Sequence, residues 1–208
     1  LVGGAVAATN GILARATFGG STFATYNTNG TATNTNGIQA FTGYNVATNI
    51  NSPAATDTVD ITSAMTTTAL TASKTLNAIR FSNASGTTIS GAALNALTLT
   101  SGGILATGGS ALNALNVPIL SLGGTQGIFH VNTGTTLTVS STLTGSGGLV
   151  KAGTGTLILT PPNSGGVSAN SLTGNVTVAD GTLRLNGGTN TLAPNQFMIL
   201  GRSTATLD

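Results

Sequence analysis

One histidine and four aspartates are the side chains that could carry out acid–base or nucleophilic chemistry in this chain of 208 residues, which has no cysteine and no glutamate. A catalytic triad would require His130 to lie beside an aspartate and an activated serine. The Gly-x-Ser-x-Gly motif that presents such a serine is absent. Because Phe129 and Val131 alternate with His130, we predict that His130 is an exposed strand residue without a catalytic role.

The four aspartates are scattered along the chain. Asp57 and Asp60 lie close together in a predicted loop, where they could form a weak cation site. Asp180 and Asp208 stand alone, and Asp180 followed by Gly181 is typical of a turn between two strands. No pair of aspartates is predicted to share a strand face at the separation that glycoside hydrolysis requires. We therefore predict no catalytic, cofactor-binding or metal-binding residue, and a protein that is not an enzyme.

The glycines and basic residues argue against nucleotide or nucleic-acid binding. Gly153-Thr154-Gly155 precedes a predicted strand rather than the helix N-terminus that binds phosphate, so we predict a corner of the fold there. Lys151 is predicted to be exposed at this turn. The six lysines and arginines are spread singly and do not form the cluster that displaces phosphate counterions. No run of about 18 apolar residues is present, so we predict no membrane-spanning helix.

Small neutral side chains dominate the composition. Threonine, asparagine and serine make up 77 of 208 residues, and charged residues only 5%, against about 25% in a typical soluble domain. Leucine, isoleucine, valine and phenylalanine contribute 51 residues, which is enough hydrophobic surface to build a core. We therefore expect a folded chain rather than a disordered one.

Hydrophobic residues alternate with threonine in short runs bounded by glycine, which predicts β-strands with one buried face. The leading residues of these runs recur at a nearly constant spacing of about 20 residues and are Leu76, Leu97, Val117, Leu137, Leu157, Val176 and Phe197. Such a period is typical of a solenoid, whereas an antiparallel sandwich has strand spacings of about 8–12 residues. We therefore predict an all-β parallel β-helix with about 20 residues per turn. In this arrangement, Leu137, Leu157 and Val176 form one interior column.

Residues 1–60 differ from the rest of the chain. They are predicted to form a capping or lateral region packed on the solenoid, which occupies residues 61–208. Five of the eight aromatic residues lie in this region: Phe18, Phe23, Tyr26, Phe41 and Tyr44. They could cover one end or one flank of the solenoid, or form a ligand surface. An exposed concave strip that included Tyr26 and Tyr44 would indicate the ligand surface.

The segment 145–185 resembles the autotransporter-associated β-strand repeat. The matching residues are Gly147, Gly148, Leu149, Lys151, Gly153, Gly155, Thr156, Leu157, Leu159, Asn170, Gly174, Val176, Val178, Gly181, Thr182, Leu183 and Leu185. Two features depart from the family pattern: Leu172 stands where an aromatic residue is usual, and residues 161–167 lengthen a loop. The upstream part more weakly resembles large bacterial surface proteins that carry this repeat.

The resemblance implies a right-handed parallel β-helix, export to the bacterial cell surface, and a role in adhesion or as a stalk. We therefore expect an extracellular, non-catalytic structural protein: a fibre or filament subunit, a stalk or an adhesin. The alternative is a passenger segment that presents a carbohydrate-binding or polysaccharide-processing surface.

Both ends of the chain suggest further protein or further subunits. Leu1 is not preceded by a methionine or a basic signal region, and residues 205–208 resemble the middle of a strand. We therefore expect an interior piece or processed form of a longer protein. We also expect self-association into filaments, because unpaired strand edges are templates for another chain. Copies could join end to end, with residues 1–8 adding to a neighbour's sheet, or the aromatic N-terminal region could insert into the next subunit by strand exchange.

Overall fold

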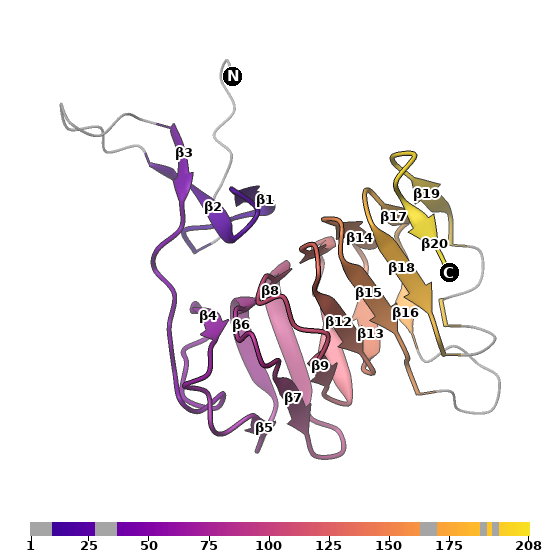
Figure 1. Ribbon diagram of the computed structural model, residues 1–208. Helices are drawn as coiled ribbons and strands as arrows, with labels where there is room; N and C mark the ends of the chain where they lie inside the picture. Colours follow the sequence, from indigo (N-terminus) through magenta and orange to yellow (C-terminus); the bar gives the residue numbers. More distant parts are fainter. Residues whose placement is uncertain (1–9, 28–36, 163–169, 188–190, 193–195) are drawn as a thin grey trace.

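The computed structural model describes residues 10–27, 37–162, 170–187, 191–192 and 196–208. These residues form twenty strands and no helix, and most of the strands build a parallel β-solenoid of about six turns (Figure 1). The predicted fold class is thereby confirmed. Residues 1–8, which we expect to join a neighbouring subunit, and residues 163–167 of the lengthened loop lie outside the described part.

The solenoid has three faces, which we name after one strand of each. The β10 face consists of β10 (Ile119–Ser121), β13 (Thr142–Gly145), β16 (Ser171–Leu172) and the first parts of β6 (Lys74–Phe81) and β8 (Ala96–Ala106). The β14 face consists of the second parts of β6 and β8 together with β4 (Thr58–Ile61), β11 (Gly127–Val131), β14 (Leu149–Ala152), β17 (Val176–Val178) and β19 (Met198–Leu200).

The third face, the β12 face, is a separate seven-stranded parallel sheet. Its strands are β5 (Ala69–Leu70), β7 (Thr88–Gly91), β9 (Asn113–Asn116), β12 (Thr136–Val139), β15 (Thr156–Leu159), β18 (Thr182–Leu185) and β20 (Thr206–Leu207). The chain visits the three faces in turn, so each strand pairs with the strand one turn before and one turn after it. Hydrogen bonds between turns therefore satisfy the backbone of the inner strands.

Successive turns are about 23 residues apart, which is longer than the sequence predicts. The number of residues per turn varies with the length of the corners. It is smaller between Asp60 and its partner Arg80 than between Lys151 and its partner Val178. The difference from the prediction arises because the hydrophobic runs counted in the sequence belong to different faces. The regular spacing between hydrophobic runs in the sequence therefore differs from the number of residues between two side chains that stack on adjacent turns.

The predicted column of Leu137, Leu157 and Val176 is correct for the first two residues and wrong for the third. Leu137 pairs with Leu157 on the β12 face, and Leu183 continues the column. Val176 is equally buried but lies on the β14 face, between Leu149 and Met198. All of these side chains belong to one continuous interior cluster that runs through the solenoid.

The outside of two faces carries columns of hydroxyl groups. On the β10 face the column consists of Thr75, Thr98, Ser121, Thr144 and Ser171, and on the β12 face of Thr136, Thr156, Thr182 and Thr206. These residues alternate with buried hydrophobic residues. Small neutral side chains stack on their own kind without the repulsion that stacked charges would cause.

A glycine at the corner after β14 shows why glycine punctuates the turns. Gly153 has φ +74°, and a Cβ there would collide with the Val131 carbonyl oxygen of the preceding turn. The predicted corner at Gly153-Thr154-Gly155 is confirmed, since it joins β14 to β15. The turn predicted at Asp180-Gly181 is confirmed in the same way between β17 and β18.

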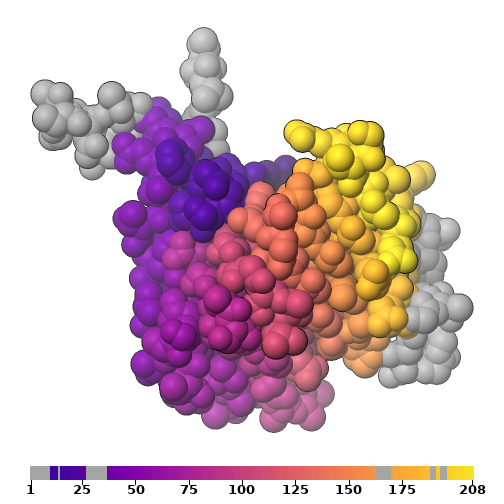
Figure 2. Space-filling view, viewed as in Figure 1, coloured from indigo at the N-terminus to yellow at the C-terminus, as the bar shows by residue number. Residues whose placement is uncertain are grey.

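A three-stranded antiparallel sheet lies on the outside of the β14 face. It consists of β1 (Leu13–Phe18), β2 (Thr22–Asn27) and β3 (Gly37–Ala40), and we call it the N-terminal sheet. Ile12 and Phe23 pack on the outward side chains of Ala78 and Leu105. The N-terminal sheet (indigo and violet in Figure 2) therefore covers the flank of the early turns. Parallel pairing of the chain begins soon after it, with the bridge between Asn45 and Val59.

Replacing Leu157 with aspartate should lower the free energy of unfolding by at least about 3 kcal/mol, because a carboxylate would be buried without a partner and the leucine packing would be lost. The matched control is Ile158→Asp, on the same strand but facing outward beside Arg184. Urea unfolding followed by circular dichroism measures both variants. Equal stability of the two variants would contradict the assignment of the interior.

Candidate functional site

The most extensively connected polar cluster of the described residues joins the N-terminal sheet to the solenoid. Arg80 on β6 forms an ion pair with Asp60 on β4, one turn below it. Ser82 donates a 2.7 Å hydrogen bond to the other carboxylate oxygen of Asp60. The Asp60 side chain is only 5% exposed, so these two partners take the place of water around its carboxylate.

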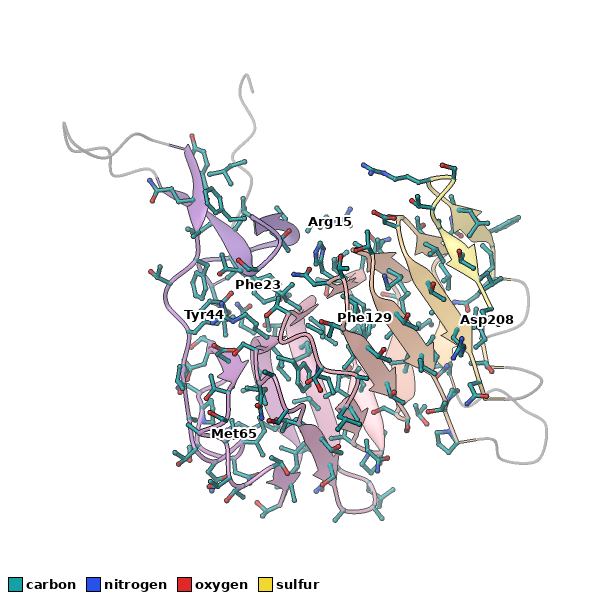
Figure 3. The ribbon with its side chains drawn as sticks, viewed as in Figure 1. Arg15, Phe23, Tyr44, Met65, Phe129 and Asp208 are labelled. Atoms are coloured by element: carbon teal, nitrogen blue, oxygen red, sulfur yellow. The ribbon has the colours of Figure 1, made fainter. Side chains whose placement is uncertain are left out.

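The same arginine contacts the N-terminal part of the chain through Tyr44, which Figure 3 labels near Phe23. Its guanidinium carbon lies 3.8 Å from the centroid of the Tyr44 ring, and Nη1 donates to the carbonyl of Ser21 at 3.4 Å. The Tyr44 hydroxyl in turn lies 2.7 Å from Thr22 Oγ1 and accepts the Phe23 amide hydrogen at 2.9 Å. We call Asp60, Arg80 and Tyr44 the Arg80 clamp.

The charge of the Arg80 clamp is permanent. Burial works against the guanidinium charge, but the hydrogen bond and the negative charge of Asp60 outweigh it, with a smaller contribution from Tyr44. The pKa of Arg80 consequently lies above its ordinary value. The Asp60 carboxylate, the two terminal nitrogens of Arg80 and the Tyr44 hydroxyl are all engaged by protein atoms, so the chemical role of the clamp is to fasten the two parts together.

Lys151 is buried, and the prediction that it is exposed was wrong. It is paired between Phe129 and Val178 on the inner side of the β14 face and has no exposed surface. Its ammonium group donates hydrogen bonds to the carbonyl oxygens of Ala152 (3.0 Å), Gly153 (2.6 Å) and Asp180 (3.0 Å). Three carbonyls at the corner therefore replace the water that a lysine normally keeps.

The environment of Lys151 disfavours its charge. Burial lowers the pKa of Lys151 to about 8, and the negative charge of Asp180 offsets only part of this effect. The group ties the corner of its own turn to the corner of the next turn, because Asp180 lies one turn further along the solenoid. Lys151 therefore connects two adjacent turns inside the solenoid and is not a surface cation.

His130 lies on the outer side of the β14 face, between Leu105 and Ala152 of the neighbouring turns. Its direction agrees with the predicted alternation, but it is half-buried rather than exposed. Burial lowers the pKa of His130, the charge of Lys151 lowers it further, and a hydrogen bond to Asn132 and the charge of Asp180 oppose these effects.

The neighbouring Asn132 donates to the carbonyl of Gly20 at 2.8 Å, which fastens the turn of the N-terminal sheet.

The structure does not bring Asp57 and Asp60 together as a cation site. Asp57 accepts hydrogen bonds from Asn45 Nδ2 (2.6 Å) and from the Ala54 amide (2.8 Å), which hold a turn. Asp60 lies on a strand rather than in the predicted loop and faces Arg80. Within the part of the chain that the structure describes, no three histidine or aspartate side chains gather as metal ligands would.

The other two aspartates also have protein partners. Thr204 donates to Asp180 at 2.7 Å and the Gly181 amide donates at 2.9 Å, and these two hydrogen bonds lower the pKa of Asp180. Asp208 pairs with Arg184 at 2.6 Å on an exposed part of the β12 face. Each aspartate therefore closes a turn or stabilises the end of a face.

Tyr26 and Tyr44 do not form a common aromatic strip. Tyr44 is committed to the Arg80 clamp and makes an edge-on contact with Phe41, with ring centroids 5.0 Å apart. Tyr26 is 45% exposed on β2, opposite Ile38 of β3. The aromatic residues thus divide between docking the N-terminal sheet and forming part of its exposed surface.

Sequence reasoning missed the pair Asp60 and Arg80, although a signal for it was present. The two residues are separated by one predicted turn, lie in alternating segments, and carry opposite charges in a chain with very few charges. This separation, together with the opposite charges, is the signal that pointed to their contact. The contact of Arg80 with Tyr44 carried no such signal, because it joins parts of the chain with different strand patterns.

Comparison with protein-family models, curated proteins and solved structures finds no match for this chain. No helix capable of crossing a membrane occurs in the described residues.

The buried lysine predicts a specific pH dependence of stability. Since the pKa of Lys151 is about 8 in the folded protein and 10.5 ordinarily, the unfolded chain binds more protons between these pH values. The free energy of unfolding should therefore rise as pH increases from about 8 to 10.5. Urea unfolding at several pH values measures it. Lys151→Met should abolish the rise, whereas Lys74→Met, which removes the other lysine, should retain it.

The hydrogen bond between the Phe23 amide and the Tyr44 hydroxyl predicts which backbone amide of the N-terminal sheet will exchange faster when that hydroxyl is removed. Tyr44→Phe removes the acceptor of the Phe23 amide, so hydrogen exchange at that amide should accelerate about tenfold, while amides of β8 and β11 keep their rates. Nuclear magnetic resonance measures the exchange of each amide. Tyr26→Phe is the control, because its hydroxyl lies on an exposed side chain; an equal effect of the two substitutions would contradict the role assigned to Tyr44.

Proposed function

We propose that this chain is a non-catalytic, extracellular structural protein of the bacterial cell surface, which acts as a stalk, an adhesin or a fibre subunit. The observation that carries the proposal is the continuous stack of parallel strands from β4 to β20, with hydroxyl columns along two outer faces. Such a stack is a rigid spacer whose stability is a sum over neighbouring turns.

The resemblance of residues 145–185 to the autotransporter-associated repeat supports placing the protein outside the cell. The structural role of its charged residues supports a function without catalysis. Asp60, Arg80 and Lys151 each fasten one part of the fold to another, through an ion pair or through carbonyl oxygens. Such side chains hold a shape rather than turn over a substrate.

Self-association into filaments is part of this proposal. Among the described strands, β19 and β20 each pair with one neighbour. Unpaired parallel edges can add the first turn of another copy, and no proline lies on either strand to prevent it. A head-to-tail contact of this kind continues without closing and gives a filament.

The competing function is a passenger segment with a carbohydrate-binding or polysaccharide-processing surface. Exposed Tyr26 favours it, since an exposed aromatic ring can stack on a sugar. A glycan array and an assay for reducing ends released from acidic and neutral polysaccharides address this function. Binding that Tyr26→Ala abolishes would favour the competing function, and release of reducing ends would contradict a non-catalytic protein.

The purified chain should gain mass with concentration in light scattering and form filaments in electron micrographs. Fibre diffraction should show the spacing between turns, about 4.8 Å, along the filament if copies stack end to end. Leu207→Lys, at the edge of the β12 face, should reduce such stacking by placing a charge on the open edge. A monodisperse monomer at high concentration would contradict self-association.

A further inference from the structure

Large exposed hydrophobic residues gather in two regions of the molecule. Among the described residues, four lie in the N-terminal part and four around the last turn, and the remaining two, Leu94 and Leu112, stand singly near turns. The two groups are Phe18, Tyr26, Ile38 and Val46, and Phe197, Ile199, Leu200 and Leu207. A contiguous exposed hydrophobic patch on a protein commonly marks an interaction site.

Beyond the N-terminal sheet, the outer surface of the β14 face carries four apolar residues and a single threonine. Val150, Thr177 and Ile199 form one column across β14, β17 and β19, and Ala152 and Ala179 lie beside it. We call these five residues the uncovered strip. It contains no charged side chain, whereas the outer β10 and β12 faces carry hydroxyl columns.

The uncovered strip continues a surface that the N-terminal sheet already occupies. The column of Val150 runs back through Ile128 and Gly103 to Ala78. Phe23 packs on Ala78, and its ring lies so close to Gly103 that a Cβ there would be 3.3 Å from it. One half of a continuous apolar surface is thus covered by the N-terminal sheet. In Figure 2, that sheet and the last strands (yellow) project on either side of the orange turns between them.

The strip would stay exposed even if another turn were stacked on the last one. Ile199 points away from the interior and is 45% exposed. A further turn stacked on β19 would cover its backbone edge and inward-facing residues such as Leu200, but not the outward side chain of Ile199. Covering the strip requires an element that lies across the β14 face, as the N-terminal sheet does over the earlier turns.

The N-terminal sheet carries an apolar patch of its own. Tyr26 and Ile38 are directly paired across β2 and β3 and are 45% and 52% exposed. A tyrosine beside an aliphatic residue supplies a large apolar surface with little loss of conformational freedom. Neither residue of this patch carries a charge.

We propose that the uncovered strip binds the Tyr26–Ile38 patch of a second copy of this chain. The inference rests on the self-association proposed above and names a lateral contact for it. A second copy fits because both surfaces are apolar and uncharged, and because the same face already holds the N-terminal sheet of its own chain. The two surfaces differ, so each copy offers one of each and the contact continues from copy to copy.

Single-surface variants test the contact. Thr177→Lys and Ile199→Lys place a charge on the strip, and Tyr26→Lys places one on the patch. Each variant, like the control below, is made in the Leu207→Lys chain, in which end-to-end stacking is reduced, and should lose the lateral association that the Leu207→Lys chain retains, with an unchanged thermal unfolding midpoint. Thr138→Lys, on the outer β12 face, is the matched control and should assemble as the parent does. Thr177→Lys keeps the test available if Ile199→Lys fails to fold.

Mixing the variants identifies the partner surfaces. The Thr177→Lys chain keeps its patch and the Tyr26→Lys chain keeps its strip, so an equimolar mixture should form one-to-one dimers that do not grow, which sedimentation measures. Assembly of both strip variants at the parent concentration, or a mixture that stays monomeric, would overturn the contact and leave filament formation standing. A monomeric parent chain would instead overturn self-association itself.

Discussion

Stacking in register is the constraint on which this structure depends. Each turn satisfies the backbone of the turn beside it, and therefore every side chain lies above a side chain of the same orientation. Like charges stacked in such a column would repel one another from turn to turn, which disfavours charged residues, and only 5% of the residues are charged. Threonine and serine tolerate this geometry, because hydroxyl groups both donate and accept hydrogen bonds. The composition is thus a consequence of the stacking.

The charges that remain show two ways of meeting the same constraint. Arg80 lies above Asp60, so the column carries opposite charges on adjacent turns. Lys151 lies inside, where three carbonyl oxygens of the corner accept its hydrogen bonds in place of a carboxylate. The pKa of Arg80 lies above its ordinary value, whereas the pKa of Lys151 is lowered to about 8. Arg80 and Lys151 therefore both connect adjacent turns, and Arg80 also connects the solenoid to the N-terminal part of the chain.

The sequence predicted the strands and the interior well because alternation is a local property of the backbone. It correctly placed Leu137 and Leu157 in one column. It failed for Val176, because a period measured between hydrophobic runs does not reveal which of three faces a run occupies. It failed for Lys151 because a charge was assumed to seek water, although the alternation with Leu149 points it inward. Tyr44 could not be placed on Arg80, since contacts between modules with different strand patterns leave no periodic signal.

The N-terminal sheet makes the three faces of the solenoid unequal. The β10 and β12 faces present hydroxyl columns to the surroundings. The β14 face presents a mostly apolar column beside the column that contains Arg80 and His130, and it is covered in part. A regular solenoid without such an element would offer similar surfaces all round and could associate on any side. Here one side carries both the docked sheet and its apolar continuation. The lateral contact that we propose is therefore directed to that side.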